Sequence, residues 1–563
     1  MRHILGINFW GHDSSAALIK DGTVAFAAAE ERFSREKKDW RFPQKAIQAA
    51  LDSVSIEFEE LDAIAFGLNR PGSVALHTLK SSLTGKVARS WAKSAVADVA
   101  RELYQGNGRR ALENAFGSVD GRKIHYIDHH ESHAWSAYAM SGIDEALVMV
   151  MDGRGSHQGT SIYRGQGGKL KRLKVFEWPN SLGTFYQSFT DLLGFDRNSD
   201  EWKVMGLAAY GQPTVSLEDC IQVNETGYEV NGSLLSGKSL FDLSFMTPRF
   251  GPRRKPEIGI AQEDMDLAAS VQKATEDAIF ATVREGVRLT GIRDLCLAGG
   301  VALNSKANGK LLASGIVDRI FVQPAAADDG TAIGSALGAF AAKGEPVPTS
   351  RMEHVFLGNE ACDADIQRDL AAFKIHGRYC PNVEEETARL LAEGGIVGWF
   401  QGRMEFGPRA LGGRSILADP RRPETRDRVN ESVKFREGWR PFAPSVLAEA
   451  APEYFENCND APFMLLTFNV RPEKREVIPA VTHVDNTARV QTVEQAVNPR
   501  YWNLIHEFAR LTAVPVLLNT SFNLRGEPIV STPKDAIRTF FSSGLDHLVL
   551  GNFIVSKSAS DSN

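Results

Sequence analysis

Residues 3–30 read HILGINFWGHDSSAALIKDGTVAFAAAE. Three short apolar runs in this stretch, His3–Asn8, Ala16–Lys20 and Thr23–Glu30, are separated by polar turns that contain glycine. Runs of this length, bounded by turn residues, are typical of β-strands. The first turn, Phe9–Ser15, contains His12, and short connections of this kind join antiparallel strands. We therefore expect the chain to begin with a three-stranded antiparallel ribbon.

The same order of features recurs further along the chain. Ala146–Met151 is apolar, Asp152–Gly159 is a polar turn with glycines, and apolar runs resume at Thr160–Tyr163 and Leu170–Glu177. Between the two copies, Asp128–Met140 is expected to be a helix that begins at an Asp cap. Two copies of strand, turn and strand around helical stretches predict a duplicated α/β domain.

A chain of 563 residues is too long for one hydrophobic core, so we expect two domains. Gly, Pro and Ser cluster at Lys343–Arg351, which places the boundary there and gives domains 1–350 and 351–563. The second domain has apolar runs of its own, among them Ile396–Phe400 and Val514–Asn519, which are expected to be strands.

Charge and cysteine content limit the expected partners and compartment. The net charge is −6 with Lys and Arg mixed among Asp and Glu, which disfavours a nucleic-acid partner, because such proteins present a basic face. The five cysteines are widely spaced, so neither a disulfide framework nor a zinc knuckle is expected. The first apolar stretch is too short for a signal peptide, and no apolar run is long enough to cross a membrane. We therefore expect a cytoplasmic protein with no membrane partner.

A DHHESH segment places His129 and His133 four residues apart. On a helix these two imidazoles share one face and can bind one metal ion, whereas His130 is rotated by about 100°. Asp152, after an apolar run, and Asp328, at the end of a loop, are placed to add carboxylate ligands at strand ends. Two histidines with one or two aspartates suit Fe(II), Mn(II) or Zn(II). The alternative is that the histidines are ordinary helix residues and that the aspartates only cap helices or form turns.

Glycine-rich turns follow the expected strands at 6–15, 152–159 and 299–300, where backbone N–H groups can approach phosphates closely. With these turns the chain resembles the actin/heat-shock-chaperone/sugar-kinase superfamily, and within it the branch that includes the tRNA threonylcarbamoyl-transfer enzymes. The shared motifs are HxxxH, EWKVMGLAAYG at 201–211, GGVALN at 299–304 and DDG at 328–330. The resemblance implies two sets of site residues: His129, His133 and Asp328 as metal ligands with Asp152 contributing, and Gly299, Gly300 and Asn304 lining the nucleotide site.

The C-terminal part contains a dense basic run, QGRMEFGPRALGGRS at 401–415. Its arginines can bind planar anions in bidentate fashion, although a solvated basic loop would have the same composition. Two trios follow, Lys434-Phe435-Arg436 and Ser521-Phe522-Asn523. On a strand the outer residues of each trio would share one face with the Phe behind, which suits a triphosphate beside a small acyl group. Such trios are also common in ordinary edge strands. Arg489 is a further candidate for binding phosphate.

The two trios resemble the KxR…SxN signature of YrdC-like domains, which bind ATP and form an acyl adenylate. An actin-like part followed by a YrdC-like part resembles the antibiotic and nodulation-factor O-carbamoyltransferases, such as the tobramycin, cephem and ansamycin enzymes. The resemblance covers nearly the whole chain. It implies an enzyme that uses carbamoyl phosphate and ATP with Mg2+ to carbamoylate a hydroxylated small-molecule acceptor. It also implies a metal, either Fe(II) or another divalent transition metal.

In such an enzyme carbamoyl adenylate is made in the C-terminal domain and used in the N-terminal domain. The resemblance assigns five residues to the first step. Lys434, Arg436 and Arg489 would neutralise the phosphate charge, and Ser521 and Asn523 would hydrogen-bond the carbamoyl group or the ribose. His12 would act as the general base for the acceptor hydroxyl, and its alternative role is that of a turn residue that bonds backbone.

Two other functions share part of this pattern. An actin-like kinase or ATPase usually has an Asp at the end of the first strand, where this chain has Asn8, and it would leave the C-terminal domain unexplained. A tRNA threonylcarbamoyl-transfer enzyme with a fused partner is disfavoured by the acidic net charge. Acceptor specificity is expected in the loops Leu68–Asn107 and Val215–Pro256, which match no motif.

Overall fold

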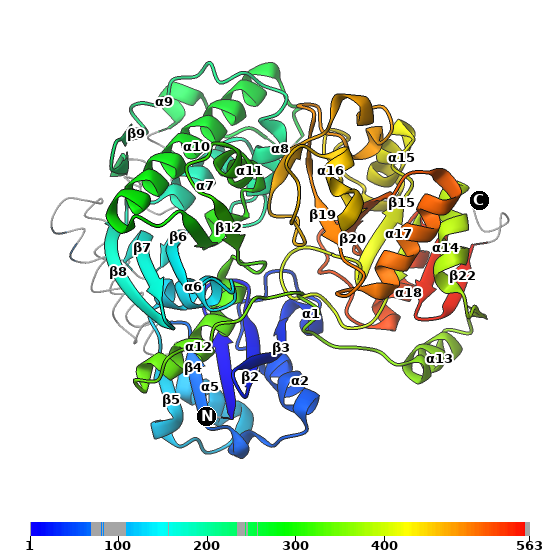
Figure 1. The fold of residues 1–563 in the computed structure, drawn as a ribbon, viewed down its shortest axis with the longest axis horizontal. Coiled ribbons are helices and arrows are strands. Elements are labelled where there is room, and N and C mark those ends of the chain that lie inside the picture. Colours follow the sequence, from blue (N-terminus) through cyan, green and yellow to red (C-terminus); the bar gives the residue numbers. More distant parts are fainter. Residues whose placement is uncertain are drawn as a thin grey trace. The chain divides into compact units, whose positions relative to one another are not determined.

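The computed structural model describes residues 2–68, 80, 83, 108–155, 157–232, 243, 246–255 and 257–557 (Figure 1). The chain divides into two compact units. Unit 1 contains Met1–Glu30 and Trp40–Met352, and unit 2 contains Glu31–Asp39 and Glu353–Asn563. The short N-terminal piece of unit 2 is not indicated by any composition change in the sequence. Large parts of the two loops expected to set acceptor specificity lie outside the described residues.

The first sheet of unit 1 begins with the three strands expected from residues 3–30. β1 (His3–Asn8), β2 (Ser15–Lys20) and β3 (Thr23–Ala29) pair in antiparallel fashion. β4 (Ala63–Phe66) then pairs with β1 in parallel, and β5 (Ile124–Tyr126) pairs with β4. The strand order is β3-β2-β1-β4-β5. The predicted antiparallel ribbon is confirmed.

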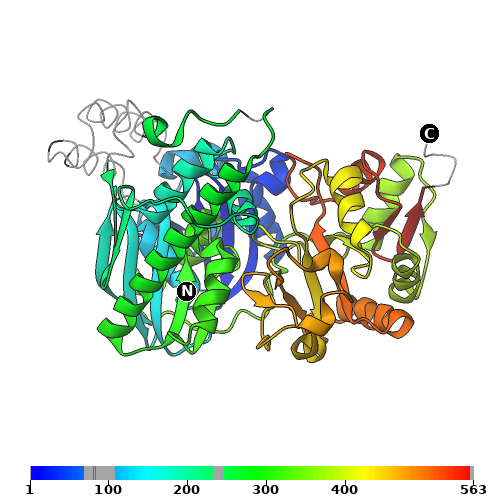
Figure 2. The same ribbon diagram turned by 90° about the horizontal axis from the view of Figure 1, so that it is seen from above.

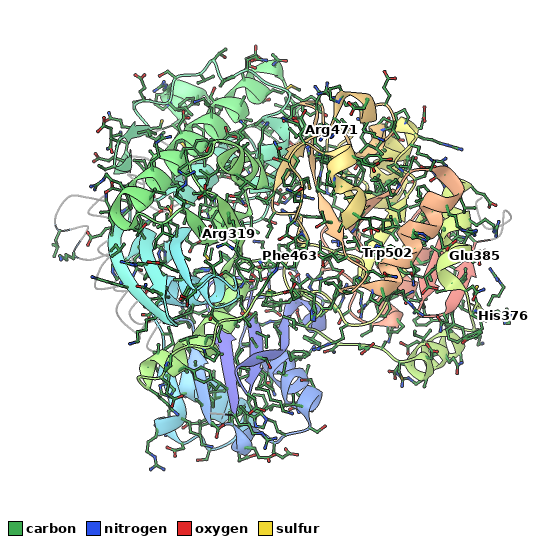
Figure 3. All side chains as sticks on the ribbon, in the orientation of Figure 1. Arg319, His376, Glu385, Phe463, Arg471 and Trp502 are labelled. Atoms are coloured by element: carbon green, nitrogen blue, oxygen red, sulfur yellow. The ribbon has the colours of Figure 1, made fainter. Side chains whose placement is uncertain are left out.

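The second sheet repeats this pattern strand for strand. β6 (Glu145–Gly155), β7 (Gln158–Gln166) and β8 (Lys169–Glu177) are antiparallel. β11 (Asp294–Ala298) lies parallel to β6, and β12 (Arg319–Val322) lies parallel to β11. The order β12-β11-β6-β7-β8 mirrors that of the first sheet, so the predicted duplication is confirmed. Arg319, labelled in Figure 3, lies on the edge strand β12, and its guanidinium pairs with Asp294 of β11.

One expected turn is wrong. The sequence predicts a loop over Asp152–Gly159, but β6 continues through Asp152 to Gly155. The pairing register shifts between Met151 and Gly155, and Gly155 pairs with Gln158. A bulge of this kind bends the strand and re-aims a side chain, which explains why a polar, glycine-containing stretch remains in the sheet.

Two helices lie between the duplicated sheets and contact each other. α12 (Thr331–Ala342) packs on β1, β2 and β4, and α6 (His129–Tyr138) packs on β6 and β11 (Figure 1). The helices approach so closely at Gly334 that a Cβ there would lie 1.7 Å from the carbonyl oxygen of Ser132. Only a residue without a side chain allows this contact, so Gly334 fixes the position of α6.

Further helices cover the outer surfaces of unit 1. The longest, α10 (Gln262–Thr290), packs on β6 and β7 and runs across the second sheet in Figure 2. The others are α2 (Gln44–Val54), α5 (Gly108–Phe116), α7 (Leu182–Leu192), α8 (Glu201–Leu207), α9 (Thr247–Phe250) and α11 (Ser305–Ala313). A small ribbon of β9 (Ile221–Asn224) and β10 (Gly227–Val230) contacts α10.

Unit 2 is built on one mixed eight-stranded sheet in the order β13-β22-β21-β14-β15-β20-β16-β19. Its strands are β13 (Arg378–Tyr379), β14 (Val397–Phe400), β15 (Arg414–Ala418), β16 (Ala443–Leu447), β19 (Gln491–Val493), β20 (Val516–Ser521), β21 (His547–Leu550) and β22 (Phe553–Ser556). The pairs β14–β21 and β16–β19 are parallel and the others are antiparallel. The predicted α/β class with a mixed sheet is therefore confirmed.

Four main helices pack on this sheet or on each other: α13 (Asp363–Ala372), α14 (Val383–Ala392), α17 (Pro499–Thr512) and α18 (Pro533–Phe541). Trp502, labelled in Figure 3, lies on α17 and donates a hydrogen bond to Glu449. A separate ribbon joins β17 (Thr467–Asn469) to β18 (Thr487–Arg489). Among the helices of the described residues, none is both long and apolar enough to cross a membrane.

Candidate functional site

Helix α6 carries the HxxxH motif into the interior of unit 1. Asp128 caps the helix by accepting a hydrogen bond from the backbone N of Glu131 at 3.0 Å. His129 and His133 are both buried, on one face of the helix. His130 points elsewhere, and its Nδ1 lies 2.9 Å from the hydroxyl of Ser161 on β7. Burial lowers the pKa of His130 to about 3, so this imidazole is neutral at ordinary pH.

Two carboxylates meet the two imidazoles. Asp152 comes from the bulged end of β6, and Asp328 from the short 3-10 turn Asp328–Gly330 that precedes α12. His129 Nε2 lies 3.4 Å from Asp152 Oδ2 and 3.5 Å from Asp328 Oδ1, and His133 Nε2 lies 3.6 Å from Asp328 Oδ1. One ligand atom from each of the four residues lies within 4.8 Å of the others. The structure thus brings together all four residues expected to bind a metal.

The electrostatics of this cluster favour a cation. Burial alone would keep His129 neutral, but Asp328 and Asp152 raise the pKa of His129 well above its usual value. Neither ring nitrogen of His133 has a hydrogen-bond partner, although its side chain is fully buried. A buried imidazole without partners is costly unless an ion completes the site. Two imidazoles and two carboxylates therefore fit a divalent transition metal.

His12 approaches the same cluster from the turn between β1 and β2. Its Nδ1 lies 2.8 Å from the carboxylate of Asp13, and its Nε2 lies 3.8 Å from Asp328 Oδ2. Asn8 holds the turn by donating from its amide to the carbonyl oxygens of His12 and Asp13, at 3.3 and 3.1 Å. The His12 side chain is about one-third exposed, so it borders both the carboxylates and solvent.

The GGVALN turn lies against the cluster of His129, His133, Asp152 and Asp328. The backbone N of Gly300 donates to Asp152 Oδ1 at 3.2 Å, and Gly299 adopts a left-handed φ of 90° next to Met151. Asn304 caps α11, and its amide forms two hydrogen bonds with Gln272 of α10, at 3.1 and 3.0 Å. Gln272 is a neighbour of this expected nucleotide site that the sequence motifs did not indicate.

The second cluster lies in unit 2, around Lys434. Its ammonium donates to the side-chain oxygen of Asn523 at 2.9 Å and to the carbonyl oxygen of Asn523 at 3.0 Å. It also donates to the carbonyl oxygen of Ser521 and lies 3.4 Å from the Ser521 hydroxyl. Ser521 Oγ in turn donates to Asn523 Oδ1 at 2.7 Å. Lys434 of the first trio therefore contacts both outer residues of the second trio.

The backbone of the first trio differs from the expectation. Lys434–Arg436 was expected on a strand, but Lys434 ends the π-helical turn Val429–Lys434, and Phe435 follows with a left-handed φ of 47°. Phe435 is half exposed rather than packed behind the trio. The backbone reversal, not a strand face, directs Lys434 towards β20. In the second trio, β20 ends at Ser521, so Asn523 lies beyond the strand.

Arginines surround Lys434. Burial, followed by the charges of Arg436, Arg440 and Lys37, lowers the pKa of Lys434 well below its usual value. Burial and the charges of Arg409 and Arg436 likewise lower the pKa of Arg489. Accumulated positive charge of this kind is stabilised by a bound anion.

Individual hydrogen bonds distinguish the arginines of the basic run. The Nε atoms of Arg409, Arg414 and Arg489 are buried without a hydrogen-bond partner, while Arg436 Nε donates to Asn430 Oδ1 at 2.7 Å. Arg414 instead donates to backbone carbonyls, including that of Gln401 at 2.8 Å, and stacks on Phe400. Arg414 therefore supports the loop through its Nη groups, and Arg409 has a buried Nε donor available to an anion.

Comparisons with protein families match most of the chain. The description "Carbamoyltransferase N-terminus" matches residues 3–337, and "Carbamoyltransferase C-terminus" matches residues 388–557. Nodulation protein NolNO of Sinorhizobium fredii is 39% identical over 98% of this chain and 80% of its own length. The 3'-hydroxymethylcephem-O-carbamoyltransferase of Amycolatopsis lactamdurans is 28% identical over 96% of this chain and 97% of its own.

Solved structures give a weaker likeness. Component A of the Acidaminococcus fermentans (R)-2-hydroxyglutaryl-CoA dehydratase aligns at a TM-score of 0.34 and 15% identity, over 61% of this chain and all of that one. Full-length HypF in its phosphate- and nucleotide-bound form aligns at a TM-score of 0.32 and 13% identity, over 62% of this chain and 56% of that one. The sequence matches to both parts of the chain identify its family. With both of its parts matched, the chain belongs to the carbamoyltransferase family and is a carbamoyltransferase.

Proposed function

We propose that the protein is an ATP-dependent O-carbamoyltransferase that divides its reaction between two sites. At the Lys434 site, carbamoyl phosphate and water give carbamate and phosphate, and carbamate with ATP gives carbamoyl adenylate and pyrophosphate. At the His129–Asp328 site, an acceptor hydroxyl attacks the carbamoyl carbon, AMP leaves, and the hydroxyl proton passes to a base. The observation that supports this division is that each unit holds its own buried polar cluster, one suited to anions and one to a cation.

The first step needs charge neutralisation on the phosphates. Lys434, Arg436 and Arg489 supply this positive charge. Burial and neighbouring cations lower their pKa values, and an incoming anion stabilises their charged forms. Mg2+ accompanies ATP as the usual counter-ion. Ser521 and Asn523, already in contact with Lys434, are placed to hydrogen-bond the carbamoyl group or the ribose.

The second step needs a base and an orienting site. A divalent transition metal, Fe(II) by resemblance, would be held by His129, His133, Asp152 and Asp328 and would supply Lewis acidity for a carbonyl. His12 accepts the acceptor's hydroxyl proton at Nε2 while Asp13 holds the other ring nitrogen. The Gly299–Gly300 turn and Asn304 line the adenylate side of this site. The acceptor is a hydroxylated small molecule, as in the cephem enzyme's name.

Separate assays of the two steps test this proposal. His129→Ala should retain carbamoyl-phosphate-dependent exchange of pyrophosphate into ATP but lose transfer from supplied carbamoyl adenylate to a 3-hydroxymethylcephem or another acceptor. Lys434→Ala should do the reverse. Exposed residues of unit 2 provide matched controls, His376→Ala (Figure 3) and Lys374→Ala, which should leave both steps unchanged.

Two results would contradict the proposal. One is equal loss of both steps in both variants while each remains folded. The other is release of ADP rather than AMP, which would indicate a kinase or ATPase of the actin-like type.

A further inference from the structure

A short segment from the N-terminal part of the sequence belongs to the adenylating unit. Glu31–Asp39, here called the strap, is assigned to unit 2, although the residues on either side of it, Glu30 and Trp40, belong to unit 1. The strap has a defined shape. It begins with the helical turn Glu31–Ser34, and a hydrogen bond of 2.8 Å from the backbone N of Lys38 to the Glu31 carboxylate links its two ends.

The backbone angles of the strap indicate that it has one defined conformation. Arg35 and Lys38 both adopt left-handed φ angles, of 64° and 57°. Such angles are uncommon for residues other than glycine and persist where surrounding contacts determine them. Two arginine side chains of the strap, Arg32 and Arg35, contact other parts of unit 2.

Arg32 holds the loop that carries Arg409. Its side chain is only 5% exposed, and Nη2 donates to the carbonyl oxygen of Gly407 at 2.9 Å. Gly407 lies two residues before Arg409, whose buried Nε has no hydrogen-bond partner and which acts electrostatically on Arg489. The position of Arg409 therefore depends on a loop that is hydrogen-bonded to Arg32 of the strap.

Arg35 holds the loop that follows Ser521 and Asn523. Its two Nη atoms donate to consecutive carbonyl oxygens, Ile529 at 2.7 Å and Pro528 at 2.9 Å, and its Nε lies 3.4 Å from Asp535. A fork of two parallel donors to fixed acceptors is a geometry that guanidinium provides and ammonium does not.

A continuous path of hydrogen bonds leads from this loop to Lys434. The carbonyl oxygen of Glu527, next to Pro528, accepts from Asn523 Nδ2 at 2.7 Å, and Asn523 Oδ1 accepts from Lys434 Nζ at 2.9 Å. The charge of Lys37, in the strap, also contributes to the lowered pKa of Lys434. The strap thus anchors the loop at Pro528–Ile529, which leads by hydrogen bonds to Lys434, and the loop that carries Arg409.

We propose that Arg32 and Arg35 are positioning residues of the adenylating site, so that a segment encoded between two elements of unit 1 acts in the first step and not in the second. This inference rests on the proposed function of the Lys434 site. Neither arginine needs to touch ATP or carbamoyl phosphate. They act by fixing Arg409, Asn523 and, through Asn523, Lys434. Displacement of such groups by about 1 Å is enough to lower a rate by about 100-fold.

The test measures the two steps in full-length Arg35→Ala, Arg35→Lys and Arg32→Ala proteins. Pyrophosphate exchange should fall by about 10- to 100-fold in each, chiefly in turnover rather than in the KM for ATP. Transfer from supplied carbamoyl adenylate to a 3-hydroxymethylcephem or another acceptor should stay at the wild-type rate. Arg368→Ala is the matched control, an exposed arginine on α13 that pairs with Asp365 of the same helix.

Chemical rescue separates positioning from general stability. Millimolar guanidinium should restore exchange to Arg35→Ala, because it can occupy the vacated position against the carbonyl oxygens of Pro528 and Ile529, but it should not restore Lys434→Ala. Hydrogen exchange should increase at residues 521–530 and remain unchanged in the strands of unit 1.

Three outcomes would overturn the inference: unchanged exchange activity in Arg35→Ala, loss of transfer together with exchange, or loss that guanidinium does not restore. Absence of exchange in the wild-type protein would instead contradict the proposed function itself. The two failures are therefore distinguishable.

Discussion

Replacement of Gly334 by alanine tests whether the α6–α12 contact holds the four candidate metal ligands together. Helix α6 carries His129 and His133, and α12 follows directly after Asp328, so this contact sets the distance between the two groups of ligands. The added Cβ would lie 1.7 Å from the carbonyl oxygen of Ser132, where ordinary contact begins at 3.4 Å. Because the obstacle is backbone, the helices must separate by more than about 1 Å.

The size of the effect follows from two opposing terms. Overpacking a core costs about 1–3 kcal/mol, while replacing glycine by alanine inside a helix returns about 1 kcal/mol. We expect the free energy of unfolding to fall by up to about 2 kcal/mol. Metal binding should suffer far more, because ligand distances must hold within about 0.2 Å. Affinity for Co(II), followed by its visible absorption, should fall by at least about 10-fold.

Gly338→Ala is the matched control. It lies one turn further along α12, and an added Cβ there would meet side-chain atoms of Ile127 and Trp135 at 2.9 and 3.1 Å, which can shift, rather than backbone. It should bind Co(II) as the wild type does. Pyrophosphate exchange should be normal in both variants. Wild-type affinity for Co(II) in Gly334→Ala would refute the idea that this contact sets the metal geometry.

Two further predictions concern charge and thiols. Lys434→Met should abolish exchange yet raise the melting temperature of unit 2 at neutral pH, because burial and neighbouring cations lower the pKa of Lys434 and so make its charged form unfavourable in the folded state. This destabilisation is largest below the lowered pKa and fades as pH rises to the ordinary value near 10.5, so a pH-independent difference in melting temperature between the two proteins would contradict it. Of the five cysteines, Cys362 is exposed and the others are buried, and burial raises the pKa of Cys458 to about 12. Because alkylation needs an accessible thiolate, mass spectrometry after brief alkylation of the native protein should find one modified thiol, at Cys362.

Local patterns in the sequence predicted much of unit 1. The three strands of residues 3–30 and the helix capped by Asp128 depend on short-range features, such as apolar runs, turn residues and a capping side chain, and all appear where expected. The meeting of His129 with His133 follows from helical spacing alone. Their contact with Asp152 depends on a bulge in β6, at a place where the sequence predicted a turn.

Long-range features were beyond the reach of sequence patterns. The trio at Lys434 was expected on a strand because its polar residues alternate with Phe435, but a left-handed residue after a π-helical turn produces the same pairing with Ser521 and Asn523. The strap could not be assigned to unit 2, since its partners, such as Gly407, lie hundreds of residues away and no local signal marks them.

The strap also constrains how the chain can be built during translation. The acceptors of Arg35 lie 493 and 494 residues downstream, so the first forty residues leave the ribosome long before their partners exist. At about 5–20 residues per second, the interval is roughly 25 to 100 seconds. The strands around the strap can pair early, whereas unit 2 is completed only when the last part of the chain has been made. A truncated product thus retains the elements that carry His129 but lacks the partners of Arg35.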